Sequence, residues 1–180
     1  MPYTQQRSAF SVIHIVDDQE TLTLKDLMYK YGSDKSRDDH GYTKLYQMLF
    51  SPIKQLVKNT TEVGIMAGQS LQAWYRYFPN AEIHAIGKYY NEKIKTNLEK
   101  LKPRLHAHIL DILEKQTNMT ELGFLEESMD IIIEDGPHCL ESRKRFLHHL
   151  IPLLKPGGIY VIEDIAFSKG GSKLFRITTK

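Results

Sequence analysis

The chain has 180 residues, of which 41% are hydrophobic and 26% are charged, and its net charge is +2. This length and balance predict one folded domain with a substantial core, and the near-neutral charge argues against a protein that binds nucleic-acid phosphates. No apolar stretch reaches the roughly 20 residues of a membrane span, and the first ten residues lack the apolar centre of a signal peptide. The single cysteine, Cys139, cannot form an internal disulfide, so we expect a reducing, cytoplasmic setting.

Residues 1–58 are predicted to form an N-terminal arm, helices and a loop. The expected elements are a strand at 10–16, a helix at 24–31, a loop dense in charge at 33–42, and a helix from Thr43 to about Phe50 that restarts at Pro52 and ends near Lys58. Thr23 and Asp26 approximate a capping box at the start of the first helix, and Gly32 marks its end.

Residues 59–180 are predicted to form a Rossmann-like core, so that the chain is one compact domain. Short apolar runs alternate with longer amphipathic stretches, as is typical of βαβ units. The expected strands are 61–66, 82–86, 106–110, 129–134 and 158–163, and the expected helices lie near 69–78, 90–102, 117–125 and 139–154, with a tight turn at 156–158. The fold class is therefore α/β, with about five parallel strands in the order 3-2-1-4-5, N-terminal helices and a shortened C-terminal part. Leu174, Phe175 and Ile177 are expected to form one short strand at an edge of the sheet.

The strand at 129–134 has the character of a central, buried strand that leads into an active site. Ile131, Ile132 and Ile133 are an unbroken β-branched run, which a strand covered on both faces requires. Asp135 and His138 follow directly, one on each side of a Gly-Pro turn. Ligands of open α/β sheets bind at this end of the strands, so we interpret these two side chains as functional rather than as a solvated turn.

A second apolar strand also ends in carboxylates, at Glu163 and Asp164. With Asp135 they make three acidic groups at the ends of neighbouring strands, which would repel one another without a cation. Oxygen ligands of this kind favour magnesium, calcium or manganese over zinc, so the sequence predicts a divalent metal here. Adjacent strand residues point to opposite faces, and the alternative that only one of Glu163 and Asp164 reaches the site stays open.

A loop with two glycines joins the first expected strand of the core to a helix. Gly64 and Gly68 permit a sharp turn and a close approach of a ligand to the main chain, and the helix beginning near Gln69 presents unpaired N–H groups. This arrangement suits a nucleotide-like cofactor, although the same spacing fits many purely structural turns. It matches neither the phosphate-loop pattern nor the dinucleotide pattern Gly-x-Gly-x-x-Gly.

These motifs together resemble the class I S-adenosylmethionine-dependent methyltransferases. Their order along the chain is Glu-Val-Gly-x-x-x-Gly-x-Ser, Ile-Ile-Glu-Asp-Gly-x-His and Pro-Gly-Gly-x-Tyr-Val-Ile-Glu-Asp. The subgroup of metal-dependent macrolide and rhamnosyl sugar O-methyltransferases, with its cephalosporin-hydroxylase-like relatives, is the most similar. Its entrance loop is similar to Tyr31-Gly-Ser-Asp-Lys35, His40-Gly-Tyr42 and Tyr46, so that the resemblance covers residues 29 to 165.

The resemblance implies S-adenosylmethionine and Mg²⁺ as cofactors, and a sugar hydroxyl of a glycan or glycosylated small molecule as the methyl acceptor. It implies the following roles: cofactor binding by Glu62, Gly64, Gly68, Ser70, Tyr42 and Asp111, magnesium binding by Asp135, Glu163 and Asp164, and general base catalysis by His138. A histidine, with an ordinary pKa of about 6.5, is suited to removing the hydroxyl proton near neutral pH. No nucleic-acid or membrane partner is implied, and a homo-oligomer is compatible with the sequence.

One departure from the family pattern affects the cofactor site. The strand at 82–86 runs into Gly87, where this fold usually has a carboxylate that holds the ribose hydroxyls. We therefore expect weaker cofactor binding, or a substitute such as Tyr89 or Asn91, and we expect Gly87→Asp to tighten binding. Two alternative functions stay open: methylation of a catechol-like vicinal diol, and a catalytically silent binding or assembly domain.

Overall fold

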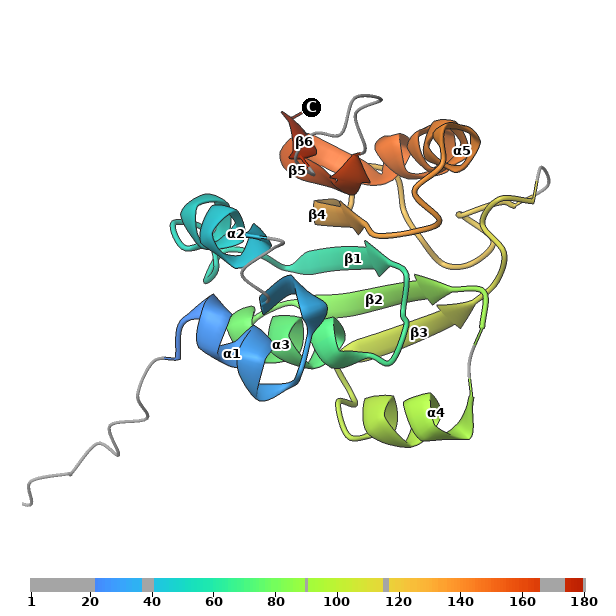
Figure 1. The fold of residues 1–180 in the computed structure, drawn as a ribbon. Helices are drawn as coiled ribbons and strands as arrows, with labels where there is room; N and C mark the ends of the chain where they lie inside the picture. Colours follow the sequence, from blue (N-terminus) through green and yellow to red (C-terminus); the bar gives the residue numbers. More distant parts are fainter. Residues whose placement is uncertain (1–21, 37–40, 90, 115–116, 166–173, 180) are drawn as a thin grey trace, which may run out of the picture.

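The computed structural model describes residues 22–36, 41–89, 91–114, 117–165 and 174–179 (Figure 1). The expected strand at 10–16 and His40 of the entrance loop lie outside these residues. The described strands are β1 (Asn59–Val63), β2 (Glu82–Gly87), β3 (Leu105–Ile109), β4 (Met129–Glu134), β5 (Leu154–Ile165) and β6 (Leu174–Thr179). They form one six-stranded sheet in the order β3-β2-β1-β4-β5-β6. The predicted parallel order 3-2-1-4-5 is confirmed, and β6 pairs antiparallel with β5 as the expected edge strand.

The described helices are α1 (Leu24–Lys30), α2 (Tyr42–Phe50), α3 (Gln69–Tyr77), α4 (Glu92–Glu99) and α5 (Leu140–Leu150), with short 3₁₀ helices at Asp34–Ser36 and Ile151–Leu153. The predicted capping box of α1 is confirmed, because the side chain of Thr23 accepts from the amide of Asp26 and the Asp26 carboxylate accepts from that of Thr23. Within the described part of the chain, no helix combines the length and the apolar character needed to cross a membrane.

Two predicted helical stretches are wrong. Residues 51–56 and 119–123 form successive turns instead of helices. In the second stretch Gly123 has a φ of 85°, and only Met119 and Phe124 anchor the segment in the core. No side chain is buried in 51–56 and only Met119 is buried in 119–123, so neither stretch has the packed apolar face that stabilises short helices in proteins.

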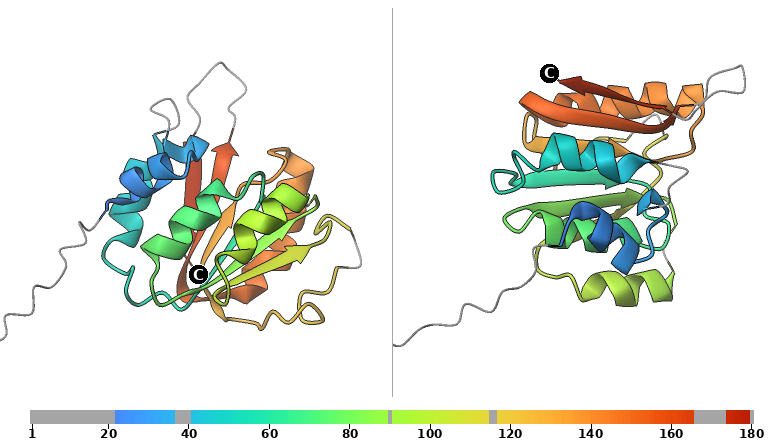
Figure 2. Two further views of the ribbon diagram at one scale, coloured as in Figure 1. Left: turned by 90° about the horizontal axis from the view of Figure 1, so that it is seen from below. Right: turned by 60° about the vertical axis from the view of Figure 1, so that its left-hand side comes forward.

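The helices pack on the two faces of the sheet (Figure 2). On one face α1, α2, α3 and α4 bury a core that contains Tyr46, Phe50 and Trp74, whose rings lie 5.2 to 6.0 Å apart. On the other face α5 and three side chains that follow β3, those of Ile112, Met119 and Phe124, cover Ile132 and Tyr160. The unbroken Ile131–Ile133 run is therefore buried from both sides, as predicted for a central strand.

The path of β5 brings two functional strand ends together. The predicted turn at 156–158 lies within β5. The register of the β4–β5 pairing shifts at this point, between Met129↔Leu154 and Ile131↔Ile159. Beyond this shift the two strands stay in regular parallel register up to Glu134↔Ile162. Asp135 and the Glu163-Asp164 pair consequently lie next to each other, just beyond the last paired residues of β4 and β5.

Candidate functional site

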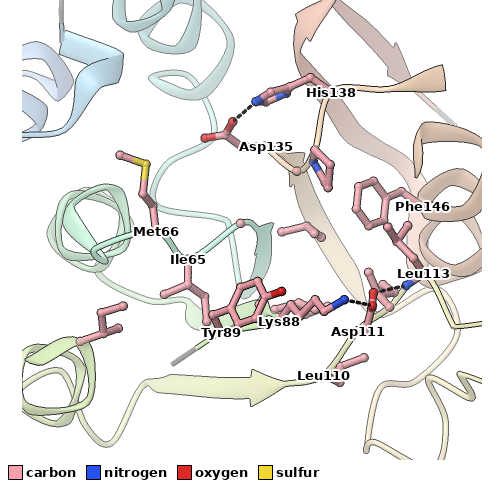
Figure 3. A pocket seen from close by; sticks show the side chains of 18 of the residues that line it. Ile65, Met66, Lys88, Tyr89, Leu110, Asp111, Leu113, Asp135, His138 and Phe146 are labelled. Atoms are coloured by element: carbon pink, nitrogen blue, oxygen red, sulfur yellow. Dashed lines mark hydrogen bonds and ion pairs between the residues drawn. The ribbon is translucent and has the colours of Figure 1, made fainter. Parts of the chain in front are cut away.

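A pocket of about 960 Å³ opens at the carboxyl ends of β1 to β4 (Figure 3). Its walls come from the chain just beyond each strand: 63–66, 86–89, 110–113 and 135–138. Ile65, Leu113 and Phe146 supply apolar surface, whereas Asp111 and Asp135 supply carboxylates. A largely apolar hollow with a few polar groups at this end of a parallel sheet is typical of a nucleotide-like ligand site.

Asp135, His138 and Asp164 converge at one side of this pocket. Each offers a ligand atom, and these atoms all lie within 4.8 Å of one another. The Nε2 atom of His138 is 3.8 Å from Oδ1 of Asp135 and 3.5 Å from Oδ2 of Asp164, and the histidine side chain is 41% exposed. The two carboxylates fit a divalent cation that keeps several waters, as Mg²⁺ or Mn²⁺ does, and the imidazole lies beside them.

The third predicted ligand, Glu163, has different partners. Its side chain is 2% exposed and accepts hydrogen bonds from Nζ of Lys35, at 2.9 Å, and from the hydroxyl of Tyr46. Asp164, by contrast, lies near His138. The structure thus brings together two of the three predicted acidic ligands, and Glu163 as a metal ligand stays a prediction.

Lys35 belongs to the site, and the sequence interpretation assigned its side chain no role. Its side chain is 2% exposed, and its ammonium forms ion pairs with Glu62 at 3.4 Å, with Glu163 at 2.9 Å and with Asp135. The sequence predicts a loop dense in charge at 33–42 and assigns the repulsion between the carboxylates to a metal alone. The chain itself supplies one cation, so that part of the argument is corrected. The excess of carboxylates at the strand ends calls for a basic partner, and Lys35 is the basic residue of the Tyr31–Lys35 motif. This signal could have identified the lysine from the sequence.

One ammonium does not neutralise three carboxylates. Burial raises the pKa of Glu163 to about 8 and that of Glu62 to about 7, and the charge of Asp135 adds to both shifts, while Lys35 opposes them. Burial lowers the pKa of Lys35, but Glu163, Glu62 and Asp135 outweigh this effect and hold that pKa well above its usual value. Lys35 therefore stays charged, and the surplus negative charge favours a proton on Glu163 or Glu62, or a further cation.

The predicted cofactor residues fall into two groups. Gly64 and Asp111 line the pocket. Glu62 and Ser70 lie at the Lys35 cluster, where the Ser70 hydroxyl donates to Glu62 at 2.8 Å. Gly68 and Tyr42 also contact other protein residues: Gly68 packs against Leu98, and Tyr42 donates to Oδ1 of Asp164 at 2.6 Å. A direct cofactor contact of Glu62, Gly68, Ser70 or Tyr42 therefore stays a prediction.

Gly64 has a steric role between two strand ends. Its φ is 106°, and a Cβ atom there would overlap the carbonyl oxygen of Asp135. Glycine is thus required for the close packing of the β1 and β4 ends, in addition to any approach of a ligand.

The end of β2 differs from the family pattern in shape as well as in charge. A Cβ atom at Gly87 would lie 2.7 Å from both Cγ1 and Cδ1 of Ile65, so the isoleucine fills the space that a side chain would need. The next residue, Lys88, pairs with Asp111 at 2.7 Å and lowers the pKa of that carboxyl (Figure 3). Among the carboxylates that line the pocket, Asp111 is the nearest along the chain to position 87, where the family pattern has its acidic residue.

Comparisons with known proteins agree with this geometry. The family described as "Methyltransferase domain" matches residues 61–165, which is more than half of the chain. The chain is 30% identical over 159 residues to 8-demethyl-8-alpha-L-rhamnosyl tetracenomycin-C 2'-O-methyltransferase of Streptomyces olivaceus, covering 84% of this chain and 40% of that protein. It is 25% identical over 155 residues to mycinamicin VI 2''-O-methyltransferase of Micromonospora griseorubida, covering 79% of this chain and 36% of that protein. The chain thus spans about two fifths of the length of these relatives.

Solved structures share the fold. MycE methyltransferase from the mycinamycin biosynthetic pathway, in complex with Mg and SAH, superposes with a TM-score of 0.68 at 23% identity, covering 79% of this chain and 37% of that one. Burkholderia thailandensis 1,6-didemethyltoxoflavin-N1-methyltransferase superposes with a TM-score of 0.56 at 15% identity, covering 86% of this chain and 65% of that one. The predicted Rossmann-like methyltransferase fold is confirmed, and the chain belongs to the methyltransferase-domain family.

Proposed function

We propose that this protein is an S-adenosylmethionine- and divalent-metal-dependent O-methyltransferase that acts on a sugar hydroxyl of a glycosylated small molecule. The observation that carries the proposal is the convergence of Asp135, His138 and Asp164 beside the pocket at the sheet's carboxyl edge. Membership of the methyltransferase family and the names of the relatives, which act on sugars of tetracenomycin and mycinamicin, support the acceptor class.

The described residues fit both groups that the proposal requires. The pocket volume of about 960 Å³ suits a nucleoside with an amino-acid tail, and Ile65 and Leu113 offer apolar surface to a purine ring. Asp111 offers a carboxylate that can accept hydrogen bonds from hydroxyl or amino groups. S-adenosylmethionine supplies an electrophilic methyl group, and a divalent cation supplies positive charge that favours ionisation of a hydroxyl. Asp135 and Asp164 would hold the cation.

His138 is the residue that we infer removes the acceptor proton. Its ring lines the pocket and is partly exposed, so an acceptor hydroxyl can reach Nε2. Carboxylate oxygens of Asp135 and Asp164 lie 3.8 and 3.5 Å from Nε2, and their charges stabilise the imidazolium that forms. An acceptor with two neighbouring hydroxyls would be held in a fixed orientation next to this histidine.

The His138→Ala change tests the base. We expect methyl transfer to fall by about 10²- to 10⁴-fold, as is typical when a general base is lost, while S-adenosylhomocysteine affinity in calorimetry stays close to that of the unaltered chain. Transfer is measured with a rhamnosyl glycoside and with a catechol as acceptors, with Mg²⁺ and with excess chelator. His148→Ala, on the exposed side of α5, is the control. Transfer that persists in chelator would contradict the metal requirement, and preference for the catechol would favour the vicinal-diol alternative.

A catalytically silent domain remains the alternative of a different class, because Ile65 occupies the space beside Gly87. Gly87→Asp alone is expected to weaken cofactor binding, contrary to the sequence-based expectation, since the new Cβ would clash with Ile65. The pair Gly87→Asp and Ile65→Ala removes the clash and should bind S-adenosylhomocysteine more tightly than Ile65→Ala alone, by roughly tenfold for one charge-assisted bond of about 1.5 kcal/mol. Equal affinity of these two variants in calorimetry would show that residue 87 does not face the ribose.

A further inference from the structure

Arg143 joins the ends of the two strands that carry the candidate metal site. It lies in the first half of α5, and its side chain is 15% exposed. Its Nη2 atom donates to the carbonyl oxygen of Asp164 at 2.7 Å and to that of Glu163 at 3.3 Å. Its Nε atom lies 3.9 Å from Oε1 of Glu134, which directly precedes Asp135. One guanidinium thus contacts the end of β4 and the end of β5 at once.

The backbone of Asp164 needs such support. Its φ is 52°, in the left-handed region that is unfavourable for residues with a Cβ atom. A residue stays in this conformation when the surrounding contacts hold it there. Arg143 binds the carbonyl group of Asp164, and the Tyr42 hydroxyl accepts from its amide at 3.2 Å while donating to Oδ1 at 2.6 Å. With both groups in place, Oδ2 of Asp164 lies 3.5 Å from Nε2 of His138.

We propose that Arg143 is a positioning residue for the metal site: it holds Asp164 in the left-handed conformation that directs its carboxylate toward Asp135 and His138. The inference rests on the proposed function, since it concerns a site that we infer binds a divalent cation. A planar guanidinium suits the task, because its several N–H groups point in fixed directions and can reach two carbonyl oxygens and a carboxylate together. A lysine ammonium has the charge but not this geometry.

Glu134 explains why an arginine rather than a neutral donor occupies this position. Its carboxylate is buried and accepts from the Tyr160 hydroxyl at 3.0 Å. The guanidinium therefore has a fixed ionic partner at the end of β4, which anchors it while its other N–H groups bind the β5 main chain.

The test compares Arg143→Met and Arg143→Lys with the unaltered full chain. Mn²⁺ affinity is measured from the electron paramagnetic resonance signal of free Mn²⁺, and S-adenosylhomocysteine affinity by calorimetry. We expect R143M to weaken Mn²⁺ binding by about 10- to 100-fold, the usual effect of removing a group that orients a metal ligand, with S-adenosylhomocysteine affinity changed by less than about twofold. R143K should recover part of the loss. Arg145→Met is the matched control, because Arg145 lies on the same helix but donates to the carbonyl oxygen of Leu113. The Mn²⁺ affinity of this control variant should be unchanged.

Backbone chemical shifts of residue 164, which report φ, give a second measurement that needs no metal. We expect a positive φ in the unaltered chain and a negative φ in R143M. A φ that stays positive in R143M overturns the inference, as does a parallel loss of Mn²⁺ affinity, S-adenosylhomocysteine affinity and melting temperature, which would indicate a general structural role. An unaltered chain that binds no Mn²⁺ refutes the proposed metal site instead, and the φ comparison then still decides whether Arg143 sets the conformation of Asp164.

Discussion

Asp135→Asn is expected to abolish metal-dependent methyl transfer while S-adenosylhomocysteine binding stays nearly intact. The amide keeps the shape of the side chain but removes the charge that a hard cation requires. A metal that stabilises developing charge contributes several kcal/mol, and about 4 kcal/mol corresponds to roughly a 10³-fold loss of rate. The measurements are initial rates across a Mg²⁺ titration, and calorimetry with S-adenosylhomocysteine.

Asp111→Asn is the matched control for this prediction. Both aspartates line the same pocket, but Asp111 pairs with Lys88 whereas Asp135 lies beside His138. Asp111→Asn should therefore weaken cofactor binding and leave the Mg²⁺ dependence of the rate unchanged. If Asp135→Asn weakened only the cofactor, or if the two variants behaved alike, the assignment of separate metal and cofactor sides to the pocket would be wrong.

The sheet could be predicted because its determinants are local. The Ile131–Ile133 run and the regular alternation of apolar and amphipathic stretches identify central parallel strands, and the crossover rule then limits their order. The stretch at 119–123 could not be predicted in the same way. Its apolar spacing suits a helix, but Gly123 adopts a positive φ and Met119 and Phe124 pack against the far face of the sheet, which is a tertiary contact that no local pattern contains.

The site could be predicted where strand ends determine it, at Asp135 and Asp164, because parallel strands end at one edge. The partners that come from other elements could not be predicted. Lys35 lies 100 residues before Asp135 in the chain, and its burial depends on how α1 and α2 pack against the short helix Asp34–Ser36 that carries it. Arg143 donates to main-chain carbonyl oxygens. Every residue has such an oxygen, so the sequence does not indicate which of them an arginine binds. Pairings of this kind depend on tertiary packing.

Lys35→Met is expected to cause the largest loss of stability. Removing one partner of a buried ion pair typically costs about 3 to 5 kcal/mol, because the remaining charge is left without compensation. Lys35 faces Glu62, Glu163 and Asp135, so the free energy of unfolding at pH 8.5 should fall by about this amount. Lys88→Met is the control. Lys88 is 55% exposed in its pair with Asp111, and an exposed pair of this kind contributes about 1 kcal/mol or less.

The loss should depend on pH in a defined direction. The folded-state pKa values of Glu62 and Glu163 are raised to about 7 and about 8 from 4.5, so the folded chain binds more protons than the unfolded chain and stability falls as the pH rises through this range. Without Lys35, which lowers both values, the two pKa values should rise further. The stability difference between Lys35→Met and the unaltered chain should therefore be small near pH 5 and largest at pH 8 to 9 in urea denaturation. A difference that is constant with pH, or that grows toward acid, would contradict the assignment.

A second substitution separates lost charge compensation from lost packing. Glu163→Gln added to Lys35→Met replaces a buried carboxylate with a neutral amide that can still accept from the Tyr46 hydroxyl. If the cost of Lys35→Met arises from uncompensated charge, the double variant should be more stable at pH 8.5 than Lys35→Met alone, and its stability should vary less with pH. If instead the cost arises from the lost packing of the lysine stem, Glu163→Gln would add a further loss. The sign of this coupling, which contacting residues commonly show at 0.5 to about 3 kcal/mol, decides whether Lys35 is the internal cation of this site.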